Sequence, residues 1–250
     1  MKKQFQIFAA TLISVVIVSC SKQGVVDPEA AQKASEEIST SSSSPNGGFV
    51  LDPLLVSLEG SFQFNNDLKD QTRKLSDGVP SAQGLADTSD RKGKLNSAIY
   101  LNGNYGIKIQ KVPQQTNTSL SVWIKPSAVY NNDGLAYIAK PSAYGPVMNH
   151  LSNLLSGGVV MNSTVPGCTA YFNNSGWRHL AVTYNGTDVK FYVNGLLVQT
   201  HNKPGYIPAS VSDYYIGDVL GFIRWKGKID DLRFYSRALS ATDVQKLYNL

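Results

Sequence analysis

The stretch WRHLAVTYNGTDVKFYVNGLLVQT, residues 177–200, is the most informative part of this chain about its fold. Two Asn-Gly pairs, Asn185-Gly186 and Asn194-Gly195, interrupt a run in which apolar residues alternate with others. Asn-Gly favours a two-residue type I′ turn, because both central residues need positive φ, which Gly and Asn adopt more readily than other residues. Alternation with a period of two marks a strand that has one buried face and one wetter face. The stretch therefore predicts three antiparallel strands joined by two hairpins.

The N-terminal residues 1–19 have the features of a lipoprotein signal peptide. Lys2 and Lys3 precede an apolar stretch from Phe5 to Val18 that is too short to span a bilayer comfortably. A small residue directly precedes Cys20, which resembles the lipobox of bacterial lipoproteins. The resemblance implies that Cys20 is acylated and becomes the mature N-terminus, and each buried methylene then adds about 0.8 kcal/mol of membrane affinity. An ordinary signal peptide with an incidental Cys20 is the alternative.

The rest of the chain divides into a tether and one domain. Residues 20–50 contain the lipidated Cys and a Ser-rich segment that buries too little apolar surface to offset its ordering entropy, so we expect a disordered linker. Residues 51–250 suit a single all-β domain. The only other cysteine is Cys168, which we interpret as a small buried residue in a fold without an internal disulfide.

The charge balance argues against a nucleic-acid-binding protein. The net charge is +5, and removal of Lys2 and Lys3 leaves 21 Lys and Arg against 18 Asp and Glu, a net charge of +3. Basic residues cluster only at 91–94 and 224–228, and no basic stripe is present. We interpret both clusters as solvent-exposed charges of loops or strand ends.

Apolar runs bounded by turn residues predict many short strands and one helix. The expected strands outside the opening stretch cover residues 56–64, 98–101, 106–109, 120–125, 135–140, 147–151, 159–162, 169–172, 214–216 and 227–235. The last segment is expected to be helical, because Ser240 is a suitable N-cap, Asp243 follows three residues later, and Val244 and Leu247 share one face.

Six segments in this order resemble the laminin G-like jelly-roll domains of the concanavalin A-like lectin and glucanase superfamily. These segments are 62–70, 97–103, 120–126, 177–184, 193–195 and 227–240. The resemblance implies an all-β fold of two antiparallel sheets packed face to face in a jelly-roll sandwich, followed here by a short C-terminal helix.

Glucanases of this superfamily use paired carboxylates about 5–9 Å apart, and this sequence offers little to form such a pair. Glu59 is the only glutamate after the linker. Asp230 and Asp231 are adjacent in a predicted strand, so we expect their side chains to point to opposite faces. The sequence therefore predicts a protein that is not an enzyme, and a glycoside hydrolase with an atypical site remains the third alternative.

Relatives of this fold often carry a structural calcium ion, and the matching positions here are Asp70 and Asp230. Calcium prefers six to eight oxygen ligands, which the loop ending at Asp70 and a strand carboxylate can supply. By strand alternation Asp230 is expected to share the buried face of Leu232. Its charge would then need calcium, backbone N–H groups or an arginine such as Arg233 or Arg237.

Sugar sites combine an aromatic platform with amide and carboxylate groups. Two segments have this chemistry, 130–171 and the Arg-Trp pair before the last strand. The candidate ligand-binding residues are Tyr130, Asn132, Tyr137, Tyr144, Arg224 and Trp225. Surface turns rich in Tyr and Asn are the alternative interpretation of these residues.

These features together predict a membrane-anchored, non-catalytic binding lipoprotein whose ligand is a carbohydrate. The alternative is an adhesion or assembly protein that binds another envelope or host protein. The expected location is the bacterial cell envelope, with the outer membrane favoured. The sequence leaves the ligand, the membrane face and the oligomeric state open.

Overall fold

The protein is described by a computed structural model that covers residues 52–81, 85–127, 136–138, 144–151, 154–161, 167–171, 176–219 and 223–250. Its strands are β1 (Leu58–Phe62), β2 (Val79–Pro80), β3 (Ala86–Thr88), β4 (Ala98–Asn102), β5 (Ile107–Gln114), β6 (Asn117–Pro126), β7 (Ala136–Ile138), β8 (Gly145–Leu151), β9 (Leu154–Val160), β10 (Gly167–Tyr171), β11 (Arg178–Asn185), β12 (Asp188–Val193), β13 (Leu196–Asn202), β14 (Ser210–Ile216), β15 (Asp218–Val219), β16 (Ile223–Arg224) and β17 (Lys226–Tyr235). The helix α2 spans Ala241–Asn249.

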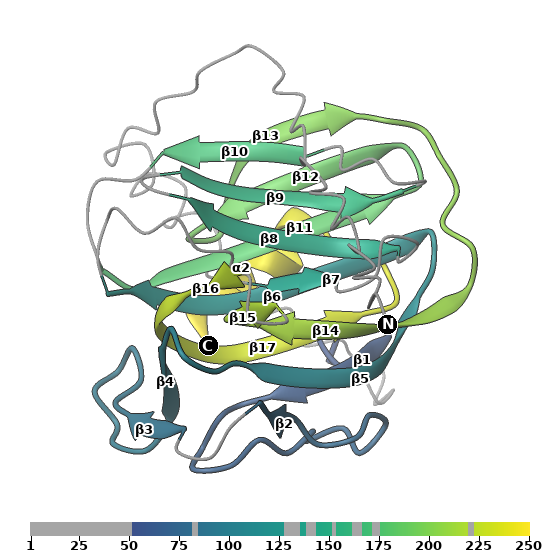
Figure 1. Cartoon of the computed structure of the whole chain (residues 1–250). Helices are drawn as coiled ribbons and strands as arrows, with labels where there is room; N and C mark the ends of the chain where they lie inside the picture. The colour runs from purple at the N-terminus through teal and green to yellow at the C-terminus, as the bar shows by residue number, and fades with distance from the viewer. Residues whose placement is uncertain are drawn as a thin grey trace, which may run out of the picture.

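The strands form two antiparallel sheets that lie face to face (Figure 1). Sheet A has the order β13-β12-β11-β6-β17-β4-β3, and β1 also pairs with β17. Sheet B has the order β10-β9-β8-β7-β14-β5-β2, and β15 pairs with β16 in a separate small hairpin. This architecture confirms the predicted all-β jelly-roll sandwich with a short C-terminal helix.

The predicted three-stranded meander is confirmed as β11, β12 and β13, but its two turns differ. At the second turn Val193 pairs with Leu196, and the two central residues Asn194 and Gly195 have φ of 51° and 81°, as a type I′ turn requires. At the first turn the central residues are Gly186, with φ of 90°, and Thr187. The type I′ prediction was therefore wrong for the first pair.

Asn185 at the first turn acts through its side chain instead of through a positive φ. Its Oδ1 accepts hydrogen bonds from the backbone N–H groups of Thr187 and Asp188, at 3.0 and 2.7 Å. Asn favours such turns because its short side chain reaches the backbone two and three residues further on.

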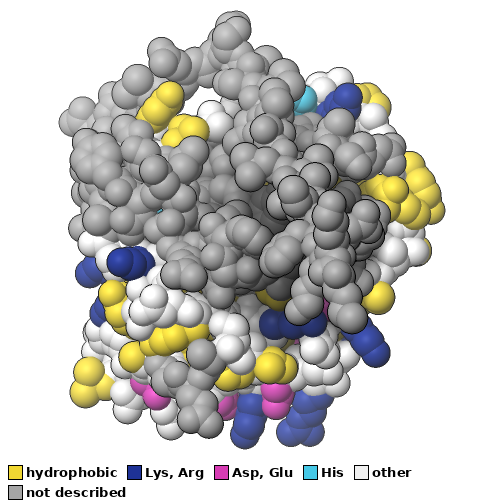
Figure 2. Space-filling view, in the orientation of Figure 1, with side chains coloured by type: hydrophobic (Ala, Val, Ile, Leu, Met, Phe, Trp, Pro, Cys, Tyr) yellow, Lys and Arg dark blue, Asp and Glu magenta, His cyan; other side chains and the backbone are white. Residues whose placement is uncertain are grey.

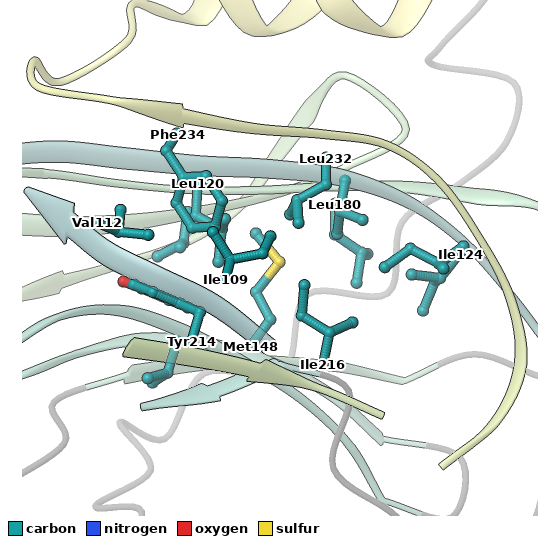
Figure 3. Packing of buried hydrophobic residues seen from close by; sticks show 14 of the residues in the cluster. Ile109, Val112, Leu120, Ile124, Met148, Leu180, Tyr214, Ile216, Leu232 and Phe234 are labelled. Carbon is teal, nitrogen blue, oxygen red and sulfur yellow. The ribbon is translucent and has the colours of Figure 1, made fainter. Parts of the chain in front are cut away.

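The main core lies between the inner faces of the two sheets. In Figure 3, side chains of sheet A such as Leu120, Leu180 and Phe234 point toward Tyr214 and Met148 of sheet B. All five are at most 3% exposed. Burial of such side chains stabilises the sandwich by about 1.5–3 kcal/mol each.

A second, smaller core lies between the outer face of sheet A and α2. It consists of Leu54, Leu58, Ala181, Tyr192, Tyr235, Leu239, Val244 and Leu247. The helix begins where predicted, because the Ser240 side chain accepts from the N–H of Asp243 and the Asp243 side chain accepts from the N–H of Ser240. This reciprocal pair is a capping box. Val244 and Leu247 therefore face the sheet as their spacing predicted.

Candidate functional site

A β-bulge in β17 turns two neighbouring carboxylates to the same side of sheet A. The register against β6 shifts between Asp230 and Arg233, and Asp231 has a φ of 46°. Both carboxylates contact Nη1 of Arg91, Asp230 Oδ2 at 2.7 Å and Asp231 Oδ2 at 2.9 Å. Asp230 pairs with Trp123 of β6 and so lies on the outer face.

Two expectations about this segment were wrong because of the bulge. The bulge breaks strict alternation, so Asp230 and Asp231 do not point to opposite faces, and Asp230 does not share the face of Leu232. The arginine that binds Asp230 is Arg91, from a loop distant in sequence. Because the Arg91 side chain is only 11% exposed, this residue is no solvated loop charge.

Arg91 belongs to a compact group on the outer face of sheet A, which we call the Arg91 cluster: Arg91, Trp123, His179, Asp230 and Asp231. The Arg91 guanidinium lies 4.7 Å from the centre of the Trp123 ring, within cation–π range. The Trp123 ring in turn lies 5.4 Å from the His179 ring. On the helix, Tyr248 stacks on Trp123 at 5.5 Å and 17°. The cluster therefore joins a loop and three strands, and Tyr248 packs α2 against it.

Burial controls the ionisation of this cluster. Desolvation, followed by repulsion from Asp231, raises the pKa of Asp230 to about 7, although Arg91 opposes the change. Desolvation, followed by the nearby charges of Arg233 and Arg91, lowers the pKa of His179 to about 3. His179 is therefore a neutral imidazole at physiological pH.

The neutral imidazole forms a buried pair with a serine. His179 Nε2 lies 2.9 Å from Ser121 Oγ, and its Nδ1 has no hydrogen-bond partner. The two residues are 1% and 2% exposed, so no substrate atom reaches the hydroxyl in this conformation. A buried Ser–His pair of this kind orders the sheet surface beneath the helix.

Asp70 is held by protein donors in a different place. Its Oδ1 accepts from the backbone N–H groups of Ser61 at 2.8 Å and Thr72 at 3.2 Å. Its Oδ2 accepts from the Thr72 hydroxyl at 2.6 Å and from the N–H groups of Lys74 at 3.0 Å and Leu75 at 2.8 Å. Although desolvation opposes it, this set of donors lowers the pKa of Asp70. The carboxylate therefore organises the loop after β1.

The two carboxylates proposed as calcium ligands therefore have separate partners. Asp70 is surrounded by N–H and O–H donors and Asp230 by a guanidinium, so this donor set does not fit a shared calcium ion. The described residues contain no group of three or more His, Cys, Asp or Glu side chains that could hold a metal. Calcium binding at Asp70 and Asp230 stays a prediction for chelation experiments.

The structure corrects one of the candidate ligand-binding residues. Trp225 is 0% exposed, and its Nε1 donates to Nδ1 of His150 at 3.1 Å within the main core. It cannot serve as an aromatic platform in this conformation. Tyr144 packs, partly buried, against the main core.

The remaining candidates are described in part or not at all. Tyr130, Asn132 and the lipidation residue Cys20 lie outside the described residues. Arg224 and Tyr137 are placed as strand positions, Arg224 paired with Asp218 and Tyr137 paired with Tyr215 of β14.

Tyr137 belongs to a group of neighbouring residues that the sequence alone did not identify. Val79, Lys108, Tyr215 and Tyr137 occupy one row of paired positions across β2, β5, β14 and β7, and we call them the Tyr215 row. The neighbouring row, with Ile107 and Ile216, faces the main core. The Tyr215 row therefore lies on the outer face of sheet B.

Charged groups fix the Tyr215 row. Lys108 Nζ lies 5.5 Å from the centre of the Tyr215 ring and 2.9 Å from Asp213 Oδ2. The hydrogen bond with Asp213 raises the pKa of Lys108. Asp213 Oδ1 also accepts from the backbone N–H of Lys111 at 3.0 Å. The alternation in β14 carried a signal for this face, because Asp213 and Tyr215 alternate with buried Ser212, Tyr214 and Ile216.

In Figure 2, the described lower part of the molecule, where β5 and β2 lie beside β3, β4 and loops, carries mixed hydrophobic, basic and acidic side chains. An aromatic ring flanked by a cation and a carboxylate can bind both the apolar face and the hydroxyls of a sugar.

No helix within the described ranges is long and apolar enough to cross a bilayer.

Comparison with known proteins agrees with the two-sheet fold described above. Residues 96–245 match the family described as "Concanavalin A-like lectin/glucanases superfamily". The chain is 27% identical over 199 residues to the adhesion G-protein coupled receptor V1 of Danio rerio, a match that spans 68% of this chain and 3% of the receptor.

Two solved structures illustrate the fold similarity. Domain 4 of the GH43 extracellular arabinanase AbnA from Geobacillus stearothermophilus, in complex with arabinotriose, aligns with a TM-score of 0.62 at 24% identity, over 77% of this chain and 98% of that one. The binding domain of botulinum neurotoxin DC, in complex with rat synaptotagmin II, aligns with a TM-score of 0.59 at 15% identity, over 77% of this chain and 51% of that one.

Proposed function

The chain belongs to the concanavalin A-like lectin/glucanase superfamily, and we propose that it is a non-catalytic protein that binds carbohydrate. The similarity to an arabinanase domain in complex with arabinotriose supports this proposal, since nearly the whole of that domain aligns. The carboxylates Asp230 and Asp231 are both in contact with Arg91, and the Ser121–His179 pair is buried, which supports a binding role over hydrolysis.

We place the carbohydrate site at the Tyr215 row, and the observation that carries the proposal is the contact of Tyr215 with Lys108. Asp213 holds Lys108 beside the ring, so the platform and its polar flank are already in place before a ligand arrives. Pre-ordered groups bind more tightly because less side-chain entropy is lost on binding.

The proposal is tested by glycan-array screening, followed by isothermal titration calorimetry with any glycan that binds. Tyr215→Ala is expected to weaken binding by about tenfold, because a stacked aromatic ring contributes about 0.5–1.5 kcal/mol beyond the area that it buries. Tyr206→Ala is the matched control, since Tyr206 is an exposed tyrosine outside the Tyr215 row. Equal loss in both variants, or a blank array, contradicts the proposal.

We further propose that Cys20 anchors the protein by a lipid in the bacterial cell envelope, with the outer membrane favoured. The wild-type chain is expected in the membrane fraction and labelled by a radioactive or alkyne-tagged fatty acid. Cys20→Ala is expected to lose the label and to move to the soluble fraction. Retention of the label in Cys20→Ala rules out this residue as the acylation site.

A protein partner is the second candidate function. It is supported by the neurotoxin binding domain that aligns in complex with a protein, and by Val79 and Val211, which expose apolar surface on the outer face of sheet B. Capture of one envelope or host protein, weakened by Val211→Asp and insensitive to added polysaccharide, would favour this function over glycan binding.

A further inference from the structure

A pocket of about 450 Å³ opens on the outer face of sheet A, away from the Tyr215 row. It lies where the first described residues, β1, the loop after it and the C-terminal residue meet, since Asp52, Gln63, Thr72 and Leu250 all line it. Its volume falls within the range of about 300–1,000 Å³ that is usual for small-molecule sites.

One side of this pocket is made of leucines. Leu54 and Leu58 belong to the small core beneath α2 and are fixed by it. Leu55 and Leu250 also line the pocket and are 62% and 46% exposed. An apolar ligand group that covered these side chains would remove their surface from water at about 25 cal/mol per Å².

The opposite side is polar and contains two cations, Lys74 and Arg233. Arg233 is poorly neutralised: its ion pair joins Nη2 to Asp231 Oδ1 at 3.6 Å, and its buried Nε has no hydrogen-bond partner. The other oxygen of Asp231 is held by Arg91. A guanidinium whose side chain is only 13% exposed pays a desolvation cost that an anionic ligand would offset.

Lys74 adds a second, more accessible charge. Its Nζ donates to the backbone carbonyl of Leu58 at 2.6 Å and lies 3.7 Å from Glu59 Oε2. The first of these contacts holds the ammonium at the edge of the pocket, and an ammonium retains two further N–H donors for a ligand.

The acidic groups at the pocket have other partners. Asp52 Oδ1 accepts from the N–H of Leu54 at 2.9 Å and so closes its own turn. The terminal residue Leu250 accepts a hydrogen bond through its carbonyl oxygen from Lys92. The pocket therefore pairs a leucine wall with two cations, Lys74 and Arg233, while the Asp52 carboxylate is held in its own turn.

We propose that this pocket binds a small aliphatic carboxylate, with the carboxylate toward Lys74 and Arg233 and the apolar chain against Leu54, Leu55, Leu58 and Leu250. The site is independent of carbohydrate binding at the Tyr215 row, because the two lie on outer faces of different sheets.

The test is isothermal titration calorimetry of the full chain with octanoate and, in parallel, with 1-octanol. Octanoate is expected to bind about tenfold or more tightly than the alcohol, because only the carboxylate forms charge-assisted hydrogen bonds. Equal affinity of the two probes, or no binding of octanoate, overturns the proposal.

Variants locate the site. Lys74→Gln and Leu55→Asp are each expected to weaken octanoate binding by about tenfold, and both side chains are exposed enough for the fold to tolerate the change. The matched controls are Lys94→Gln and Leu197→Asp, whose side chains are exposed elsewhere. Octanoate binding that survives in Lys74→Gln and Leu55→Asp overturns the assignment to this pocket.

A further measurement separates this site from the proposed function. Lys74→Gln and Leu55→Asp are expected to keep wild-type affinity for any glycan that binds at the Tyr215 row. Tyr215→Ala is expected to keep wild-type affinity for octanoate. Loss of octanoate binding in Tyr215→Ala overturns the placement of the carboxylate site.

Discussion

At the scale of single residues, the conformation of Asp231 has the widest consequences. A φ of 46° is uncommon for a residue other than glycine, although aspartate tolerates it better than most. It places two carboxylates on one face of β17, where mutual repulsion and burial cost free energy. Arg91 offsets part of that cost by contacting both, and it also packs on Trp123.

This arrangement predicts a specific dependence of stability on pH. The pKa of Asp230 is about 7 in the folded protein and ordinarily about 3.8, so the folded state binds the proton more tightly. The resulting stabilisation is fully present below pH 3.8 and is lost as the pH rises through 7. The thermal midpoint of the wild type should therefore fall, relative to that of Asp230→Asn, between about pH 4 and pH 7, as measured by circular dichroism.

The groups that face Asp230 define the control. Arg91, Asp231 and Asp90 all act on its pKa, and none of them changes in Asp230→Asn. Asp87→Asn removes an exposed carboxylate from β3 and should retain the wild-type pH profile. Parallel profiles for the wild type and Asp230→Asn would show that Asp230 does not titrate in this window.

At the scale of elements, α2 illustrates how a local signal and a tertiary contact cooperate. An isolated helix of nine residues is marginal in water, so α2 depends on its capping box and on packing of Val244 and Leu247 against sheet A. Arg237 adds an ion pair to Asp243 at 2.8 Å. The helix then supplies Tyr248 to the Arg91 cluster.

Removal of the cap should weaken this element measurably. Ser240→Ala deletes the acceptor for the N–H of Asp243 and is expected to lower the free energy of unfolding by about 1 kcal/mol in urea denaturation. Thr242→Ala, an exposed change in the first turn, should alter it by less than about 0.5 kcal/mol. A Ser240→Ala variant as stable as the wild type would mean that packing alone holds α2.

Strand β9 shows where sequence pattern was insufficient at this scale. The predicted strand began at Val159, whereas β9 begins at Leu154 and includes Gly157 and Gly158. Two consecutive glycines usually indicate a turn or a weak strand. Here Gly157 is required by the facing sheet, since a Cβ at this position would lie 2.3 Å from Cδ2 of Phe191.

At the scale of the whole molecule, that contact sets how closely the two sheets approach. Gly157→Ala is expected to destabilise the protein by about 1–3 kcal/mol, because Phe191 is 0% exposed and has little room to move. Phe191→Leu in the same chain should restore part of the loss. A double-mutant cycle by urea denaturation is expected to give a coupling of about 0.5 kcal/mol or more.

Additive effects of Gly157→Ala and Phe191→Leu would contradict this account of the sheet contact.

A polar contact also links strands of different sheets: Oε1 of Gln199 in β13 accepts from the N–H of Thr169 at 2.8 Å. At this edge of the sandwich, a polar contact therefore joins β13 to β10, and close packing joins the next strands, β12 and β9.

Features that depend on short-range geometry could be predicted from the sequence. Alternation from Leu180 to Val193 specified the meander, Asn194-Gly195 specified a turn with two positive φ values, and Ser240 specified the start of the helix. Each of these follows from a few neighbouring residues, and the ordered series of such segments indicated the jelly-roll family.

Long-range folding establishes which distant residues meet and which side chains are accessible, and this could not be predicted from local sequence. The bulge at Asp231 places Asp230 on the face opposite to the expected one. Arg91, which is 139 residues away in the sequence, contacts Asp230, and Trp225 is buried in the core. The Tyr215 row and the leucine-lined pocket arise in the same way, from strands and loops that are adjacent in space alone. Alternation fixes a side chain's face only while the register is regular, and long-range packing determines where regularity ends.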